Sequence, residues 1–473
     1  MTRTTGPVAR PSTYYQRDWV LACRERLSYY SLPLVWDLRG ALDVPALTRA
    51  LADLTARHEA LRTCFAIRGD EVDQLVWPSV DLDLSTVDIS AESSVVDQIV
   101  AETERPRRVD VAPLWHGVLY RLAERRHLLA LFVHHLVFDG WSHGVLHDEL
   151  IRCYRGAVAG RPARLPELRA QAGDHAEWER AQRDEAAEVW WRDQLRGLPP
   201  LSVIPPVGGR FVSVPLPVVP ADQVAVLRRL ASEQDAGLSS VLLAVVLAAR
   251  RSRTGDDAIV GVTRAGRDRS GLQRVVGPLL DHVPVRVDLS GARTFPEVVA
   301  RTHRAYQAAL ARALPLGRIR QVTPDDLSGR GGRLYDTRFN YLPGAAATSA
   351  VISTSDGHEL SIAPYPLDPL RLAPRHTEDH PEVLPYSFIL RRLPGGEIGG
   401  EVCGHDSLGD DLVRAAAAVG DAVEAAVASV AVSPPRATTP RGAVTPSRVT
   451  GRPDTAALAS ATASPLPAPG SPS

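Results

Sequence analysis

Apolar residues recur with helical and with strand spacing along the chain. Between Pro45 and Phe65 they recur every three or four residues, which predicts a helix with one buried face. The segment His127–Val133 is a continuous apolar run of strand length, and Gly140 interrupts the pattern soon after it. A second helix is expected to follow, with Ser142 as its cap. The pattern therefore predicts a strand, a tight loop and a helix.

The second half of the chain repeats this alternation after a break. A charged stretch, Asp174–Leu195, is predicted to be helical, and Gly197, Pro199 and Pro200 mark an expected boundary between lobes. The later elements that we expect are helices at Ser239–Arg250 and Leu412–Val430, and strands at Ala258–Val262, Val283–Val287 and Phe388–Leu393. Because strands and helices alternate in both halves, the sequence predicts an α/β protein with two lobes of similar size.

Composition and charge narrow the class of protein. The chain has 473 residues, 44% of them hydrophobic, which suggests two or three domains with a large buried core. Its net charge of -1 argues against nucleic acid or a membrane surface as partner. The segment Met1–Pro11 has no apolar core of a signal peptide, and the longest apolar run, Val241–Ala249, is shorter than a membrane span of roughly 20 residues. A soluble, cytoplasmic protein is the expectation.

The basic residues, the cysteines and the C-terminal segment indicate little about function. The 54 basic residues are all arginines, and the four cysteines are scattered, without metal-type spacing, so we expect them to be reduced. From Ser433 to Ser473 the sequence is dominated by Pro, Ala, Ser, Thr and Arg, which predicts a disordered tail.

The segment His134-His135-Leu136-Val137-Phe138-Asp139-Gly140 carries the candidate chemistry. A histidine at a strand end can project into a cleft, where its near-neutral pKa suits proton transfer. Asp139 can fix the loop by pairing with an arginine, and Gly140 allows a positive φ or a close backbone approach. A histidine and an aspartate at this spacing also arise by chance, so the pattern alone leaves a purely structural loop open.

A metal site is an alternative role for these histidines. His134 and His135 should point to opposite faces of an extended segment, which makes them a poor chelating pair. His143 and His147 have helical spacing but lack the glutamate of the HExxH pattern, which favours a solvated helix face. We therefore expect no metal.

The wider sequence resembles a known family. His134–Ser142 resembles the HHxxxDG signature of the condensation domains of nonribosomal peptide synthetases, in the chloramphenicol acetyltransferase-like superfamily. The other segments that resemble motifs of that family occur in the family's order: Pro11–Trp19, Arg57–Phe65, Asp174–Trp178, Trp190–Leu195, Gly261–Arg267, Val276–Arg286 and Phe339–Tyr341. The resemblance covers residues 11 to 430.

Some positions depart from the family pattern. Leu280-Asp281-His282 replaces Val-Asn-Thr, which puts the acceptor preference in doubt. The glutamate of epimerisation relatives, the first-position aspartate of heterocyclising relatives and the DFGWG element of plant coenzyme A acyltransferases are all missing. No adenylation or carrier domain is recognisable, so we expect a free-standing condensation enzyme.

The resemblance implies two chloramphenicol acetyltransferase-like lobes in a V-shaped arrangement, with an active-site channel at their interface. The boundaries that we expect are 1–173 for the N-terminal lobe, 174–200 for a linker helix, 201–432 for the C-terminal lobe and 433–473 for the tail. It also implies a donor held on the phosphopantetheine arm of a partner carrier protein, either acyl or peptidyl, and no bound cofactor.

By resemblance, His135 acts as general base or orients the nucleophile, and the Gly140 N–H donates to the oxyanion. His134, Asp139 and Arg267 should support the site, with Asp139 and Arg267 forming an ion pair. The residues expected along the substrate channel are Arg62, Trp141, Ser142 and His282. Each of these residues also has a simpler structural interpretation: a surface arginine for Arg62, a core aromatic for Trp141, a helix cap for Ser142 and a residue without substrate contact for His282.

The predicted function is an acyltransferase that joins a carrier-tethered aminoacyl or acyl thioester to an amine or alcohol, either free or carrier-bound. The product is an amide or ester in secondary metabolism. Two alternatives remain open, a coenzyme A-dependent acyltransferase of the same superfamily and a condensation-like module that has lost catalysis and recruits partner enzymes.

Overall fold

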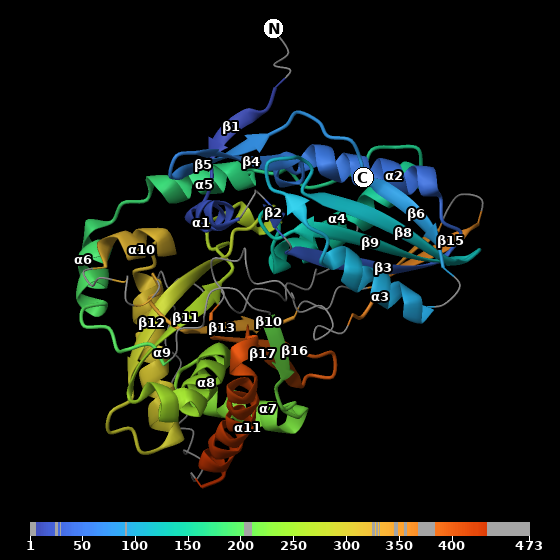
Figure 1. The fold of residues 1–473 in the computed structure, drawn as a ribbon. Helices are drawn as coiled ribbons and strands as arrows, with labels where there is room; N and C mark the ends of the chain where they lie inside the picture. Colours follow the sequence, from blue (N-terminus) through green and yellow to red (C-terminus); the bar gives the residue numbers. More distant parts are fainter. Residues whose placement is uncertain are drawn as a thin grey trace, which may run out of the picture.

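The chain folds into two α/β lobes, which lie one above the other in Figure 1. The computed structural model describes residues 6–23, 27–28, 30–89, 92–202, 211–323, 327, 330, 332–344, 349–353, 357–367 and 384–432. The predicted disordered tail, 433–473, lies outside the described residues. Each lobe is built on a six-stranded sheet, so the α/β class predicted from the alternating pattern is confirmed.

The N-terminal lobe has apolar side chains on both faces of its sheet. The strands, in spatial order, are β14 (Ala350–Ser353), β15 (Glu359–Pro364), β3 (Ser31–Gly40), β9 (Arg126–His134), β8 (Trp115–Ala123) and β6 (Leu84–Asp88). Leu129, Leu131 and Val133 of β9 share a core with helices α2 (Val44–Arg57) and α4 (Gly140–Val158). The alternate residues of β9 pack with α3 (Glu92–Thr103) on the other face. This double burial explains the unbroken apolar run in the sequence.

The C-terminal lobe covers one face of its sheet with helices. Its strands are β10 (Phe211–Pro215), β17 (Ile398–His405), β16 (Tyr386–Arg392), β13 (Thr337–Leu342), β11 (Asp257–Arg264) and β12 (Asp281–Asp288). The helices that share its core are α7 (Ala221–Glu233), α8 (Leu238–Thr254), α9 (Phe295–Ala311) and α11 (Gly409–Val432). Figure 1 shows α7, α8 and α11 on the side of the sheet that faces away from the N-terminal lobe.

Smaller elements complete the two lobes. They are β1 (Val8–Pro11), β5 (Glu71–Val76) and β4 (Thr63–Arg68) in one sheet, the pair β2 (Leu27–Ser28) and β7 (Arg107–Arg108), and helices α1 (Tyr14–Ala22) and α10 (Leu316–Val322). Among the described residues, no single helix is long and apolar enough to cross a membrane. Helices α7 and α8 meet that test only as a pair, which is bent by 102° and lies in the core of the C-terminal lobe.

Two predicted boundaries differ from the structure. The expected linker helix is two helices, α5 (Ala172–Ala181) and α6 (Glu185–Gln194), because Asp184 caps a new helix by accepting the Ala187 N–H. The strands β14 and β15 fall within the predicted C-terminal lobe, 201–432, yet they extend the N-terminal sheet. There β15 pairs antiparallel with β3, which places Ile362 opposite Leu38.

Candidate active site

The candidate loop joins the end of β9 to the start of α4. His134 is the last residue of β9 and pairs with Ser31 of β3, which fixes where the loop begins. Asp139 caps α4, since its side chain accepts the Ser142 N–H at 2.9 Å. The prediction that Ser142 caps the helix is therefore wrong, because the aspartate three residues earlier takes that position. The hydroxyl of Ser142 instead lies 2.7 Å from Asp139 Oδ1 and accepts the Gly277 N–H at 3.0 Å.

His135 has its tautomer set by the loop itself. Its Nδ1 lies 2.7 Å from the Phe138 carbonyl oxygen, which only accepts, so Nδ1 carries the proton and donates it. The Nε2 atom is then the basic nitrogen. Burial lowers the pKa of His135, so the imidazole is neutral at pH 7. The side chain is half-buried, and the arrangement gives a neutral base.

An aromatic wall holds the His135 ring, and the sequence analysis did not assign it a role. Tyr30 stacks on the ring with centroids 5.3 Å apart and an angle of 19°. Tyr15 and Trp19 of α1 approach the same ring, with centroids at 6.3 and 5.8 Å. Tyr15 and Trp19 fall within the Pro11–Trp19 motif, which was the available signal, whereas Tyr30 had none. Together these rings restrict the orientation of His135.

Asp139 and Arg267 form the predicted ion pair. Arg267 Nη1 lies 2.7 Å from Asp139 Oδ2, and Nη2 lies 3.0 Å from Oδ1, a bidentate contact in which both side chains are 2% exposed. Asp139 Oδ2 also accepts the Leu279 N–H at 3.1 Å. Since both oxygens are occupied, Asp139 is held as a structural anion that ties α4 to the C-terminal lobe.

The segment that carries Arg267 turns sharply. Gly266 has a φ of +65°, and a Cβ there would collide with the Leu279 carbonyl oxygen. Gly140, by contrast, has the helical conformation of the first residue of α4, so the positive φ that we considered for it is not present. A Cβ at Gly140 would meet no atom within 4 Å, and its N–H belongs to the first helical turn, whose amides have no partner within the helix.

The remaining predicted site residues differ in their burial and in their contacts with the loop. His134 is fully buried, and its Nδ1 accepts the Leu136 N–H at 3.0 Å, which supports the loop as expected. Trp141 is 37% exposed, so it is not a core aromatic. Arg62 donates to the carbonyls of Thr55 and Trp77, at the ends of α2 and β5. These contacts give Arg62 a structural role and leave its expected place along the substrate channel without support.

His282 lies close to the same wall. It is buried on β12, and its ring centroid is 6.3 Å from that of Tyr15. Tyr15 is therefore a neighbour of both His135 and His282. On α4, His147 is buried and its Nδ1 accepts the indole Nε1–H of Trp36 at 2.7 Å, while burial lowers the pKa of His143 to about 4. The solvated face predicted for these two histidines is wrong, because both rings contact Trp36 of β3, which leaves His147 buried and His143 half-buried.

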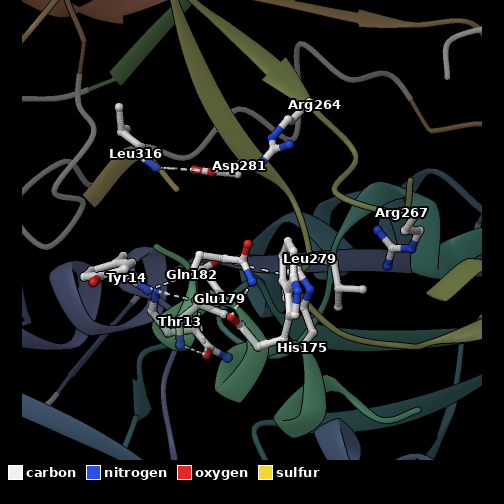
Figure 2. Close-up of polar contacts among 12 residues, drawn as sticks. Thr13, Tyr14, His175, Glu179, Gln182, Arg264, Arg267, Leu279, Asp281 and Leu316 are labelled. Atoms are coloured by element: carbon white, nitrogen blue, oxygen red, sulfur yellow. Dashed lines mark hydrogen bonds and ion pairs between the residues drawn. The ribbon is translucent and has the colours of Figure 1, made fainter. Parts of the chain in front are cut away.

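A second polar cluster joins the lobes beside this wall. Figure 2 shows Glu179 and His175 together on α5, and Asp281 of β12 beside Arg264 and Leu316. Glu179 accepts the Tyr14 N–H at 2.7 Å, and Asp281 accepts the Leu316 N–H at 3.2 Å. Burial, and then the neighbouring Asp281, raises the pKa of Glu179 to about 8, and burial also raises the pKa of Asp281. Two carboxyl groups are thus held where charge is costly.

Comparison with known proteins places this geometry in a family. The family model described as "Condensation domain" matches residues 10–368. Surfactin synthase subunit 1 of Bacillus subtilis (strain 168) is 32% identical over 354 residues, which is 72% of this chain and 9% of that protein. Phosphinothricin tripeptide synthetase PhsC of Streptomyces viridochromogenes is 33% identical over 298 residues, 58% of this chain and 27% of that protein. The chain thus spans a small part of these relatives.

Solved structures agree with the sequence matches. The X-domain from teicoplanin biosynthesis superposes with a TM-score of 0.72 at 26% identity, over 91% of this chain and 96% of that one. The first condensation domain of the calcium-dependent antibiotic synthetase, in complex with a substrate analogue, has a TM-score of 0.69 at 20% identity, over 90% and 97%. The family and the fold predicted from the motifs are confirmed.

Proposed function

Because the chain belongs to the condensation-domain family, we propose that it transfers an aminoacyl or acyl group from a carrier-bound thioester to an amine or alcohol. An amide is the first product to test for, since one matched relative is a tripeptide synthetase. The observation that carries the proposal is the Nδ1 to Phe138 contact of His135, which makes Nε2 the base. That base lies on the same short loop as the Gly140 N–H, an oxyanion donor.

The proposed step moves one proton and exchanges one bond. The acceptor nitrogen or oxygen attacks the thioester carbonyl carbon, and its proton passes to Nε2 of His135. Negative charge develops on the carbonyl oxygen, where the Gly140 N–H donates. The C–S bond then breaks, and the departing thiolate takes the proton from His135. The products are one amide or ester and one free thiol, with no change of oxidation state.

The site residues have different roles in this reaction, and the importance of the base depends on the acceptor. A thioester is already activated, so holding the acceptor and donor together supplies much of the acceleration for an amine. An alcohol is a weaker nucleophile and depends more on the base. Asp139 and Arg267 keep the loop and the start of α4 in place. The proposal includes a carrier protein as partner, a cytoplasmic location and no bound cofactor.

The direct test is product formation measured by mass spectrometry. An aminoacyl-loaded carrier protein is supplied with a paired amine and alcohol, and the same acyl group is offered as its coenzyme A thioester in a parallel reaction. We expect the wild type to use the carrier-bound donor. His135→Ala should lower kcat roughly 10²–10⁴-fold while the protein stays folded. His303→Gln on α9, where His303 contacts Ser240, is the matched control.

A recruitment role is the second candidate. It is favoured by the similarity to the X-domain from teicoplanin biosynthesis, which is also solved in complex with OxyB at a TM-score of 0.72 and 26% identity. The intact His135 base and the Asp139–Arg267 pair favour catalysis instead. Carrier binding without turnover, for both acceptors and both donors, would replace the proposed function with this one.

A further inference from the structure

Arg338 of β13 lies on the face of the C-terminal sheet that is turned towards the N-terminal lobe. Side chains alternate along a strand, and the next residue, Phe339, belongs to the core that the sheet shares with its helices. Arg338 is half-buried and therefore lies on the opposite face. Because α7, α8 and α11 cover the side away from the N-terminal lobe in Figure 1, the face of Arg338 is the one nearer to that lobe.

The strand register relates Arg338 to the wall around His135. Strand β11 pairs with Arg338 two residues before Thr263, and Thr263 itself pairs with His282 of β12. The centroid of the His282 ring is 6.3 Å from that of Tyr15, and the Tyr15 centroid is 6.3 Å from that of His135. Arg338 and His282 therefore share one sheet face, with β11 between their strands, and His282 reaches the wall.

The positive charge of Arg338 acts on two rings of the candidate site. Burial lowers the pKa of His135, Asp139 raises it, and Arg338 lowers it. Burial raises the pKa of Tyr30, and among the charged groups near that ring Arg338 has the largest effect, which lowers the pKa. A substrate group beside these rings is therefore within reach of the field of Arg338.

Two acidic side chains on the same sheet face are bound by other arginines. Glu401 of β17 forms a bidentate contact with Arg391, at 2.8 and 2.6 Å. At the edge of the sheet, Arg286 Nη2 lies 2.6 Å from Asp257 Oδ2. Because each of these carboxylates has an arginine of its own, negative charge on a substrate is attracted to this face rather than repelled.

We propose that Arg338 binds a carboxylate of the acceptor and so selects a free amino acid or hydroxy acid, an inference that rests on the proposed function. A carrier-bound acceptor has its carboxylate converted into a thioester, which carries no charge. A guanidinium matches a carboxylate with two parallel hydrogen bonds. The amine or hydroxyl of the same molecule is then available to Nε2 of His135. Arg338 thus determines specificity and takes no part in proton transfer.

The experiment compares acceptors that differ only in the carboxylate. One panel contains the common amino acids and their 2-hydroxy acid counterparts. The other contains the carboxamides of the same compounds, which keep the nucleophile and the side chain but have no negative charge. Each panel is offered with the carrier-bound acyl donor, and so is an acceptor carrier loaded with the same amino acids. Products are identified by mass spectrometry, and kcat/KM is measured for each acceptor that reacts.

Three variants are measured beside the wild type. Arg338→Gln removes the charge, and Arg338→Lys keeps the charge but not the planar fork. Arg304→Gln on α9 is the matched control, because Arg304 is exposed and donates to the Ala300 carbonyl of its own helix.

The expected result is a preference that depends on Arg338. The wild type should have a kcat/KM roughly 10–100-fold higher for an acid than for its carboxamide, since the carboxamide loses a charged hydrogen-bonded contact. Arg338→Gln should remove this preference by lowering kcat/KM for the acid alone, and Arg338→Lys should retain part of it. An equal loss for acid and carboxamide would assign Arg338 a structural role and overturn the proposal. A wild type that prefers the carboxamides or the loaded acceptor carrier would overturn it as well.

Binding measured without a donor separates this proposal from the proposed function. Saturation-transfer NMR is recorded with each panel of free compounds, for the wild type, Arg338→Gln and Arg304→Gln. Selective binding of acids over carboxamides, lost in Arg338→Gln but kept in Arg304→Gln, supports the role of Arg338 even if no product forms. Equal binding of the two panels to the wild type, or binding of neither, overturns it whatever the turnover.

Discussion

His135 and Asp139 lie four residues apart, and their surroundings give them different chemistry. The Asp139 carboxylate accepts from Arg267, Ser142 and Leu279, so both of its oxygens are occupied. Only Nδ1 of His135 is used by the loop, which leaves Nε2 basic. Loss of activity in an Asp139 variant would therefore reflect the position of the loop rather than a proton transfer.

We predict that Asp139→Ala lowers the free energy of unfolding by about 3–5 kcal/mol, because it leaves the Arg267 charge buried and unpaired. Urea denaturation measures this loss. The double variant Asp139→Ala/Arg267→Met should recover part of it, since the buried charge is then removed as well. A loss below about 1 kcal/mol in the single variant would contradict a buried ion pair.

At the same scale, kcat/KM should fall at acidic pH as His135 gains a proton. Burial lowers the pKa of His135 below its ordinary value of 6.5, so the neutral base predominates at pH 7 and is lost only below pH 6.5. A pH–rate profile with the carrier-bound donor measures the midpoint. A midpoint above pH 7 would mean that another group, or a charged imidazole, controls the rate.

The sequence predicted the residues of this site where the motif is local. His135, Asp139 and Gly140 share one loop, and the Arg267 pairing came from the family pattern. The prediction from sequence failed for residues whose surroundings are formed by segments remote in the chain. The simpler alternative for Trp141, a core aromatic, is wrong, because the turn at Gln273 contacts its Nε1–H while the side chain stays exposed. The stacking of Tyr30 on His135 depends on the pairing of β3 with β9, which no local pattern reveals.

At the scale of elements, the turn before Arg267 determines whether the ion pair can form. Gly266 adopts a positive φ directly beside the Leu279 carbonyl, while Gly140 has open space around it. The two glycines bracket the Asp139–Arg267 contact and differ in their need for a missing side chain. They therefore make a matched pair of substitutions.

Gly266→Ala should destabilise the protein by about 1–3 kcal/mol, through the strained φ and the collision with Leu279. Gly140→Ala should leave the free energy of unfolding nearly unchanged, because its Cβ meets no atom within 4 Å. Thermal unfolding of the two variants provides the comparison. Equal stability of both would show that the turn adapts without cost.

Most regular elements were predictable from the apolar pattern, and their ends were not. The helix expected at Ser239–Arg250 is α8, and the strand expected at Val283–Val287 is β12, each a few residues longer than predicted. The stretch 174–195 was expected to be one helix because its charged residues suit a helix throughout. The cap at Asp184 is what divides it into α5 and α6.

At the scale of the whole molecule, stability should depend on pH through the carboxyl cluster between the lobes. Glu179 keeps its proton up to about pH 8 when folded and loses it near pH 4.5 when unfolded, so its contribution to stability falls as pH rises between those values. His175 has the opposite effect on stability. Burial, and then Arg264, lowers its pKa to about 4 in the folded protein, so its contribution to stability increases as pH rises to 6.5. The net loss should therefore appear between pH 6.5 and 8.

Denaturant unfolding at several pH values measures this dependence. Glu179→Gln keeps an oxygen that accepts the Tyr14 N–H and removes the titrating group, so the slope between pH 6.5 and 8 should flatten. The raised pKa of Asp281 adds a loss of stability of the same sign as pH rises above 3.8. An unchanged slope in the variant would assign the effect to groups outside this cluster.

The crossover of β14 and β15 also bears on how the protein is made. During synthesis β3, β9 and β8 leave the ribosome long before β15, so the edge of β3 has no partner until Pro364 has been translated. An open strand edge of this kind pairs readily with other chains. The edge of β3 is thus open to mispairing while residues 135–364 are translated. Chaperone demand and soluble yield should therefore depend on the speed at which ribosomes translate the codons for these residues.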